Sequence, residues 1–169
     1  MATQNLLTYK CKFLGYAEVE ANAEASYTPL MGVLEGLSIS QEAASESAIN
    51  GEFYDTPLES VGTLGPYKIE FDLIRYKPED IVAMEGGKFA ASTGLYTMPS
   101  SFTNVYKRFK LEFYNGIDYI VVYKGKVVTN WDGTDLKTAP LKLHIVITAL
   151  VDDGGKTVEM KMAEPSAKG

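Results

Sequence analysis

Apolar and polar residues alternate along much of the C-terminal half of the chain, which predicts antiparallel β-strands. In residues 105–113 the apolar positions are Phe109, Leu111 and Phe113, and the polar positions between them are Arg108, Lys110 and Glu112. A period of two is typical of a strand with one face in a core. Asn115-Gly116 follows, the strongest short hairpin signal, so residues 118–131 are predicted to return beside this strand.

The same alternation predicts further strands. Residues 140–151 and 156–162 flank the turn sequence Asp-Asp-Gly-Gly and are predicted to form a second hairpin. Between residues 67 and 73, Ile69, Phe71 and Leu73 are predicted to face inward, and Lys68, Glu70 and Asp72 outward. Weaker patterns at residues 5–20 and 27–40 predict strands near the start of the chain.

One helix is predicted over about residues 78–86. Pro78 suits the first helical position, and Glu79 and Asp80 place acids in the first turn. Gly86-Gly87 is a stop signal. Residues 89–102 are small and polar and predict a loop with one short strand at most.

These elements predict one mostly-β domain across residues 1–169, a β-sandwich or small barrel of antiparallel strands with one short flanking α-helix. No internal repeat or linker divides the chain. We expect an N-terminal arm over about residues 1–10, a long acidic loop over about residues 40–60, and a flexible tail over about residues 163–169.

Composition narrows the classes of protein to consider. Hydrophobic residues make up 46% of the chain and charged residues 22%, which fits a globular domain with a sizeable core. No apolar run approaches the roughly 20 residues of a membrane span, and the first twelve residues show no secretory-signal pattern. Cys11 is the only cysteine, so an internal disulfide is excluded and synthesis in a reducing cytoplasm is expected.

Charge is divided unevenly along the sequence. Residues 13–67 carry nine acids and no Lys or Arg, which gives this segment a formal charge of −9. The rest of the chain carries sixteen bases and thirteen acids, a formal charge of +3. A solvated acidic surface would account for this. A surface complementary to another copy of the chain, or one that repels nucleic acid, would account for it equally.

Residues that could carry catalysis do not form a recognisable set. His144 is the only histidine, which excludes a site with two histidines, and Cys11 has no partner motif. Carboxylate pairs such as Glu70 and Asp72 fit a solvated strand face, and residues 131–135 resemble only a fragment of a calcium loop. We therefore expect no enzyme activity, no cofactor and no metal.

Over residues 32–87, a strand ending in Ser-Ile-Ser is followed by an acidic Ala/Ser-rich loop, the cluster Phe53-Tyr54-Asp55, an alternating strand, and a helix that acids begin and glycines end. This order of elements resembles that of the major tail proteins (tail tube proteins) of tailed bacteriophages. The likeness lies in this order more than in residue identities. The inner-tube proteins of contractile injection systems are related to this family.

The resemblance implies a structural virion protein rather than an enzyme. Members of the family fold as a β-sandwich with a flanking helix, close into rings of six, and stack into a tube through which DNA passes without specific binding. The implied partners are further copies of the chain and other tail proteins such as a tape measure, a terminator or a sheath. Assembly in the host cytoplasm and a final location in the virion tail are implied as well, with no membrane partner.

Two sets of candidate residues follow from the resemblance. The loop that would stack one ring on the next contains Glu42, Glu46, Glu52, Phe53, Tyr54, Asp55 and Glu59. The candidates for the lumen, on strand faces opposite the core, are Glu70, Asp72 and Glu112. An acidic lumen would not trap DNA, because fixed negative charge repels phosphates.

Other classes of protein fit parts of the pattern. A tail terminator, a head–tail connector or the inner tube of a secretion system would share the fold and close into rings. A capsid decoration or adhesion module would be a β-sandwich without need of a long acidic loop. A small-ligand barrel or an enzyme would need a pocket with converging polar groups, for which the sequence gives no sign.

Overall fold

The computed structural model describes residues 10–20, 26–30, 34–49, 59–114 and 116–162. The predicted tail over residues 163–169, most of the predicted N-terminal arm, and Glu52, Phe53, Tyr54 and Asp55 lie outside the described residues. The main sheet contains β1 (Cys11–Ala17), β2 (Thr28–Pro29), β3 (Leu34–Gln41), β6 (Tyr67–Leu73), β9 (Val105–Phe113), β10 (Ile117–Asp132), β11 (Lys142–Leu150) and β12 (Val158–Met162). Two hairpins, β4 (Ser45–Ile49) with β5 (Glu59–Thr63) and β7 (Lys88–Ala90) with β8 (Leu95–Thr97), and the helix α1 (Pro78–Glu85) complete the fold.

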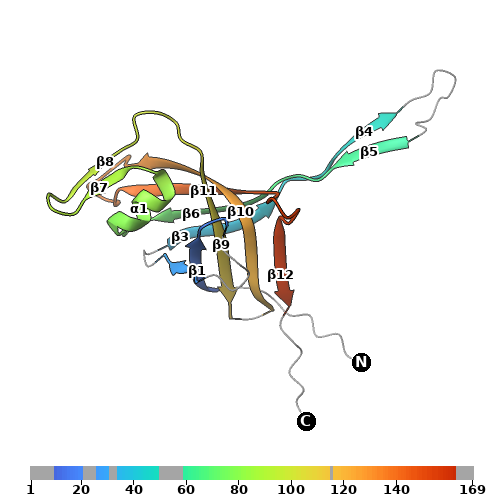
Figure 1. Ribbon diagram of the computed structural model, residues 1–169, viewed down its shortest axis with the longest axis horizontal. Helices are drawn as coiled ribbons and strands as arrows, with labels where there is room; N and C mark the ends of the chain where they lie inside the picture. The colour runs from blue at the N-terminus through green and yellow to red at the C-terminus, as the bar shows by residue number, and fades with distance from the viewer. Residues whose placement is uncertain (1–9, 21–25, 31–33, 50–58, 115, 163–169) are drawn as a thin grey trace, which may run out of the picture.

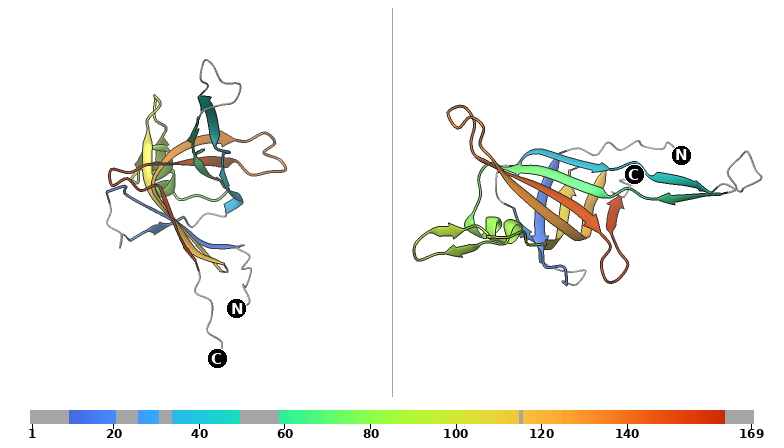
Figure 2. Two further views of the ribbon diagram at one scale, coloured as in Figure 1. Left: turned by 90° about the vertical axis from the view of Figure 1, so that its right-hand side faces the viewer. Right: turned by 90° about the horizontal axis from the view of Figure 1, so that it is seen from above.

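The main sheet is antiparallel and has the order β2-β1-β9-β10-β11-β6-β3, with β12 also pairing with β10. The 16-residue strand β10 belongs to two layers. Its first part pairs with β12 from Ile117 to Val122, and its second part pairs with β11 from Lys124 to Asp132. We call β2, β1, β9, β12 and the first part of β10 the first layer, and β3, β6, β11 and the second part of β10 the second layer. Figures 1 and 2 show the strands of the two layers running across each other.

The core fills the space between the two layers. Alternate residues of four strands are fully buried there, together with Met84 of α1: Ile69, Phe71, Leu73, Phe109, Leu111, Val122, Leu143, Ile145 and Ile147. The alternation predicted the four strands from which these side chains come, and it predicted the buried face of β6, β9 and β11. The expected mostly-β sandwich with one flanking helix is confirmed.

The helix has the predicted bounds to within one residue. Pro78 begins it, and Gly86 ends it with a φ of 84°, donating its N–H to the carbonyl of Val82. Its last residue, Glu85, accepts hydrogen bonds from the Tyr96 hydroxyl (2.6 Å) and from Nε1 of Trp131 (3.2 Å). These contacts connect α1 to the β7–β8 hairpin and to the end of β10, so the helix and this hairpin cover one end of the sandwich (Figure 1).

The acidic segment differs from the predicted loop. Over its described residues it forms an antiparallel hairpin in which Ser45 pairs with Thr63 and Ile49 pairs with Glu59. Because neither strand has a core to face, the sequence shows no clean alternation there, and every described residue of β4 and β5 is exposed. We call residues 43–65 the arm. The predicted loop at residues 89–102 likewise contains the short β7–β8 hairpin.

Gly125 lies where β10 passes from one layer to the other. The register between β10 and β9 shifts between Val122 and Gly125, and a Cβ added at Gly125 would lie 2.6 Å from Cγ2 of Ile147 and 2.9 Å from Cδ2 of Phe109. Both neighbours are fully buried, so neither side chain has free space into which to move. A side chain is therefore excluded at the point where the sheet turns over.

We predict that Gly125→Ala lowers the free energy of unfolding by about 1–3 kcal/mol, because it overpacks the core at a rigid position. Urea unfolding followed by circular dichroism measures the change. Gly62→Ala is the matched control, because a Cβ there meets no atom closer than 3.8 Å. Equal unfolding free energies for the two variants would contradict the role assigned to Gly125.

Asp80 is a buried acid in the first turn of α1. It is 3% exposed, and its Oδ2 has no hydrogen-bond partner. Burial raises the pKa of this carboxyl above its ordinary value, and the charge of Glu79 adds to the rise, whereas Lys77 opposes it. The folded state therefore holds the proton more tightly than the unfolded state does. The stability that comes from this difference is fully present below the unfolded pKa and is lost as pH rises through the folded pKa.

We predict that Asp80→Asn gains stability relative to the natural chain as pH rises from acid to neutral, because the amide has no charge to desolvate. Unfolding by urea at a series of pH values measures this difference. Glu79→Gln, at an exposed position in the same helical turn, is the control and should show no comparable gain. A constant difference between Asp80→Asn and the natural chain across this pH range would refute the prediction.

Candidate assembly surfaces

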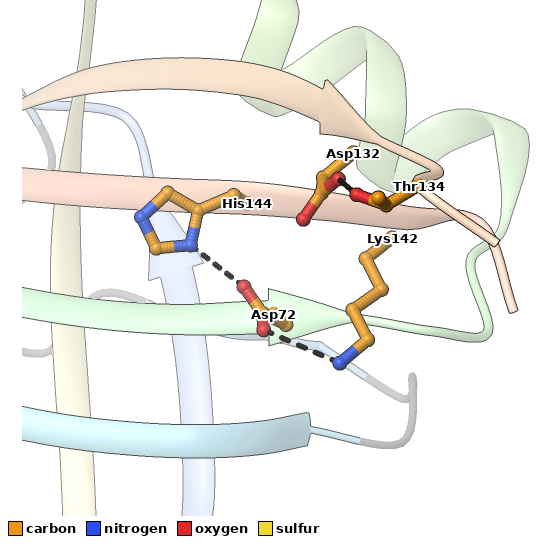
Figure 3. A network of polar contacts seen from close by, with 5 residues as sticks. All are labelled: Asp72, Asp132, Thr134, Lys142 and His144. Atoms are coloured by element: carbon orange, nitrogen blue, oxygen red, sulfur yellow. Dashed lines mark hydrogen bonds and ion pairs between the residues drawn. The ribbon is translucent and has the colours of Figure 1, made fainter. Parts of the chain in front are cut away.

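The outer face of the second layer carries a polar network around Asp72. Asp72 of β6 and His144 of β11 are paired across the two strands, and His144 Nδ1 lies 2.6 Å from Asp72 Oδ1. Lys142 Nζ lies 4.0 Å from Asp72 Oδ2. Figure 3 shows both side chains directed toward the carboxylate, with Asp132 nearby accepting a hydrogen bond from Thr134 (2.9 Å). The predicted outward direction of Asp72 therefore agrees with its position in the fold.

The charges on this outer face are nearly balanced, which differs from the acidic surface that we expected. Strand pairing places four lysines and three acids on it among the described side chains: Lys68, Lys124, Lys126, Lys142, Glu70, Asp72 and Asp132. The carboxylate of Asp72 lies between His144 and Lys142, so much of its negative charge is compensated locally. A polyanion beside this face would meet no strong net charge of either sign.

The Asp72–His144 pair is not the start of a catalytic triad in the part of the chain that the structure describes. There, no hydroxyl or thiol hydrogen-bonds His144, so the imidazole has no nucleophile to activate. The same described residues include no group of three or more His, Cys, Asp or Glu side chains that could hold a metal ion. The pair connects two neighbouring strands from positions 72 residues apart in the sequence.

Glu112 does not share a surface with Glu70 and Asp72. It lies on β9, on the outer face of the first layer, where its Oε1 is 3.2 Å from Nζ of Lys110. The inner faces of both layers line the core, so their outer faces point away from each other. The structure therefore brings two of the three lumen candidates together and places the third on the other side of the molecule.

The outer face of the first layer is rich in tyrosine and base, which sequence reasoning missed. We call six residues of β9, β10, β12 and the β11–β12 connection the basic tyrosine face: Arg108, Lys110, Tyr119, Tyr123, Lys156 and Lys161. Arg108 and Tyr123 of this set are buried, and Lys156 and Lys161 are exposed. The pattern Tyr-Lys-Arg-Phe-Lys at residues 106–110 is a signal for it. Lys156 and Lys161 could be assigned to the same face only once the pairing of β12 with β10 was known.

The arm projects beyond the body of the protein (Figure 1). At its root, Glu42 forms an ion pair with Lys68 of β6, and the N–H of Glu42 donates to the Pro66 carbonyl (3.1 Å). Further along, Glu46 and Glu59 have no ion pair among the described residues. Ile49 and Val61 lie on the same face of the hairpin and are 46% and 55% exposed. Of the stacking candidates, Glu42 is thus paired within its own chain, whereas Glu46 and Glu59 face solvent.

A groove of about 620 Å³ lies at the root of the arm, between residues 64–67 and the β11–β12 hairpin. Its lining is mostly apolar and includes Leu64, Tyr67, Val151, Val158 and Met160. Leu64 is 81% exposed, so this surface is an apolar patch of the kind that often marks a contact between proteins. The described residues that line it include no charged side chain.

Comparisons with known proteins found no protein-family model and no curated protein that matches this chain. Among the described residues, no helix has the length and hydrophobicity to cross a membrane.

Proposed function

We propose that this chain is a structural protein of the tail-tube type, which assembles into rings that stack into a tube for the passage of DNA. The observation that carries this proposal is the arm, a two-stranded hairpin that reaches beyond the body with every described residue exposed. An isolated two-stranded hairpin is only marginally stable in water. An arm of this kind gains stability when it lies against another copy, as stacking of rings requires.

Open sheet edges support ring formation. Within the described residues, β3 and β12 each pair along one side only, with β6 and β10 respectively. An unpaired edge offers backbone N–H and C=O groups to a further strand. A contact between different edges of two copies is head-to-tail, and it closes into a ring when the rotation between copies permits. A ring of six is what the resemblance to tail tube proteins implies.

The outer face of the second layer is the candidate lining of the lumen. In Figure 1, α1 and the β7–β8 hairpin cover one end of the sandwich and leave this face open. Glu70 and Asp72 remain the lumen candidates, and Glu112 would lie on the outside of the same ring. The balance of lysines and acids on this face suits a passage through which DNA moves without being held. Other tail proteins would be partners at the two ends of the tube.

Electron microscopy of the purified protein tests the proposal. We expect rings or tubes with a central hole. Replacing residues 44–64 with a short Gly-Ser connection should abolish stacking and leave the fold intact, because β4 and β5 are exposed along their whole length. Gly62→Ala is the control, since it keeps the arm and should still form tubes.

The outcomes separate the candidate functions. A chain that remains a monomer at high concentration would contradict the proposal. Tubes that persist without the arm would show that stacking does not depend on it. Closed rings that never stack, from the natural chain, would favour a tail terminator instead.

A further inference from the structure

The sandwich is open along one side. The described residues of β3 and β12 do not pair with each other, so the two layers stay apart between these two edge strands. Half-buried apolar side chains of both layers reach this opening, among them Leu37 and Ile39 of β3 and Ile117 of β10. We call the opening between β3 and β12 the mouth. Apolar surface of this kind, which the described fold covers only in part, favours a further contact.

Two adjoining apolar grooves occupy the mouth. The groove of about 620 Å³ at the root of the arm has Tyr67 and Met160 in its lining, and a second groove of about 350 Å³ shares both residues. Side chains of both layers line this second groove. Among the described residues that line either groove, Lys10 is the only charged one. The mouth therefore suits an apolar occupant.

The chain passes the mouth at Lys10. This residue lines the smaller groove, and its carbonyl accepts a hydrogen bond from the N–H of Tyr114, just beyond β9 (3.4 Å). Its φ of 58° is a left-handed value that residues other than glycine seldom adopt, so the backbone bends sharply beside the groove. Residues 1–9 directly precede this bend and lie outside the described residues. In extended form they would be longer than the five residues of β12, which borders the mouth.

Composition favours residues 1–9 as the occupant. They contain Leu6, Leu7 and Tyr9 and no charged side chain. Residues 163–169 follow the end of β12 and also adjoin the mouth, but their apolar residues are only two alanines and a proline. Burial of a leucine removes far more apolar surface from water than burial of an alanine does. Of these two terminal segments, only residues 1–9 can cover the lining of the mouth with large side chains.

We propose that residues 1–9 lie in the mouth of their own chain and act as a plug, which keeps the apolar lining and the β12 edge from other copies. Because Lys10 holds the segment beside the groove, its local concentration there exceeds that of a second copy in dilute solution. Without the plug, an apolar surface beside an unpaired strand edge would promote association. This effect on association rests on the proposed function, in which such edges join copies, whereas occupancy of the mouth does not.

Thiol labelling measures occupancy of the mouth. Met160 is 44% exposed, and in a chain with Cys11→Ala the change Met160→Cys leaves a single thiol there for iodoacetamide. Adding Leu6→Ser, Leu7→Ser and Tyr9→Ser, which we call the serine variant, should raise the labelling rate about tenfold or more in the monomeric chain. Burial of even one leucine favours the covered state by at least that factor.

Two matched controls accompany the labelling. Thr3→Ser with Gln4→Ser and Asn5→Ser changes only polar residues of the same segment and should leave the rate at residue 160 unchanged. Val128→Cys places the thiol at a position of similar exposure, 42%, on the outer face of the second layer. Its labelling rate should be the same with and without the serine variant.

Sedimentation tests the effect of the plug on association. With Cys11 and Met160 restored, the serine variant should associate at about tenfold lower concentration than the natural chain, because the same covering equilibrium competes with contacts between copies. The polar control variant should associate as the natural chain does.

The outcomes decide the inference separately from the proposed function. Equal labelling rates with and without the serine variant overturn the inference, even if the natural chain forms tubes. Protection that is lost on dilution assigns the mouth to a second copy and overturns it too, as does faster labelling without stronger association. Faster labelling with stronger association upholds the plug, even if microscopy of the natural chain shows no rings and the tube function fails.

Discussion

The structure depends on one strand, β10, that serves both layers of the sandwich. Sixteen residues run from the first layer into the second, and the change of layer takes place where the register with β9 shifts, at Gly125. A glycine there lets Phe109 and Ile147, from strands on either side of β10, approach the backbone closely. Because the sheet turns over at this point, one face of each of β1, β6, β9, β10 and β11 lines the core, and the other face of each layer is directed outward.

That arrangement gives the molecule two outer surfaces of different chemistry. The surface of the second layer is nearly balanced in charge, with Asp72 held between His144 and Lys142. The surface over β9 and β12 has more bases than acids, and Lys110 lies over the half-buried ring of Tyr119. The arm leaves the body from the end of β3 and returns into β6, so four of the nine acids of residues 13–67 belong to the arm. Part of the division of charge along the sequence thus becomes a division in space, which favours contacts between copies.

The local pattern of apolar and polar residues was sufficient to predict the strands and the helix that face the core. The alternation at Ile69, Phe71 and Leu73 identified β6 and its buried side, and Pro78 and Gly86 bounded the helix to within one residue. Local pattern could not reveal the turn-over of β10, because residues 118–131 read as one uninterrupted strand. For the same reason Glu112 could not be assigned to the side opposite Glu70. The pairing of Asp72 with His144 depends on the alignment of β6 with β11, strands that are far apart in the sequence. The strands of the arm gave no signal because they face no core.

Backbone hydrogen exchange of the arm tests the central claim most directly, which is that the arm is completed by another copy. The amides of β4 and β5 should exchange far faster than those of β6 and β11 in the dissociated chain, because a two-stranded ladder without a core opens readily. In the assembled protein the same arm amides should become strongly protected. Protection of the arm that is already equal to that of the body in the dissociated chain, or that does not increase on assembly, would contradict the account.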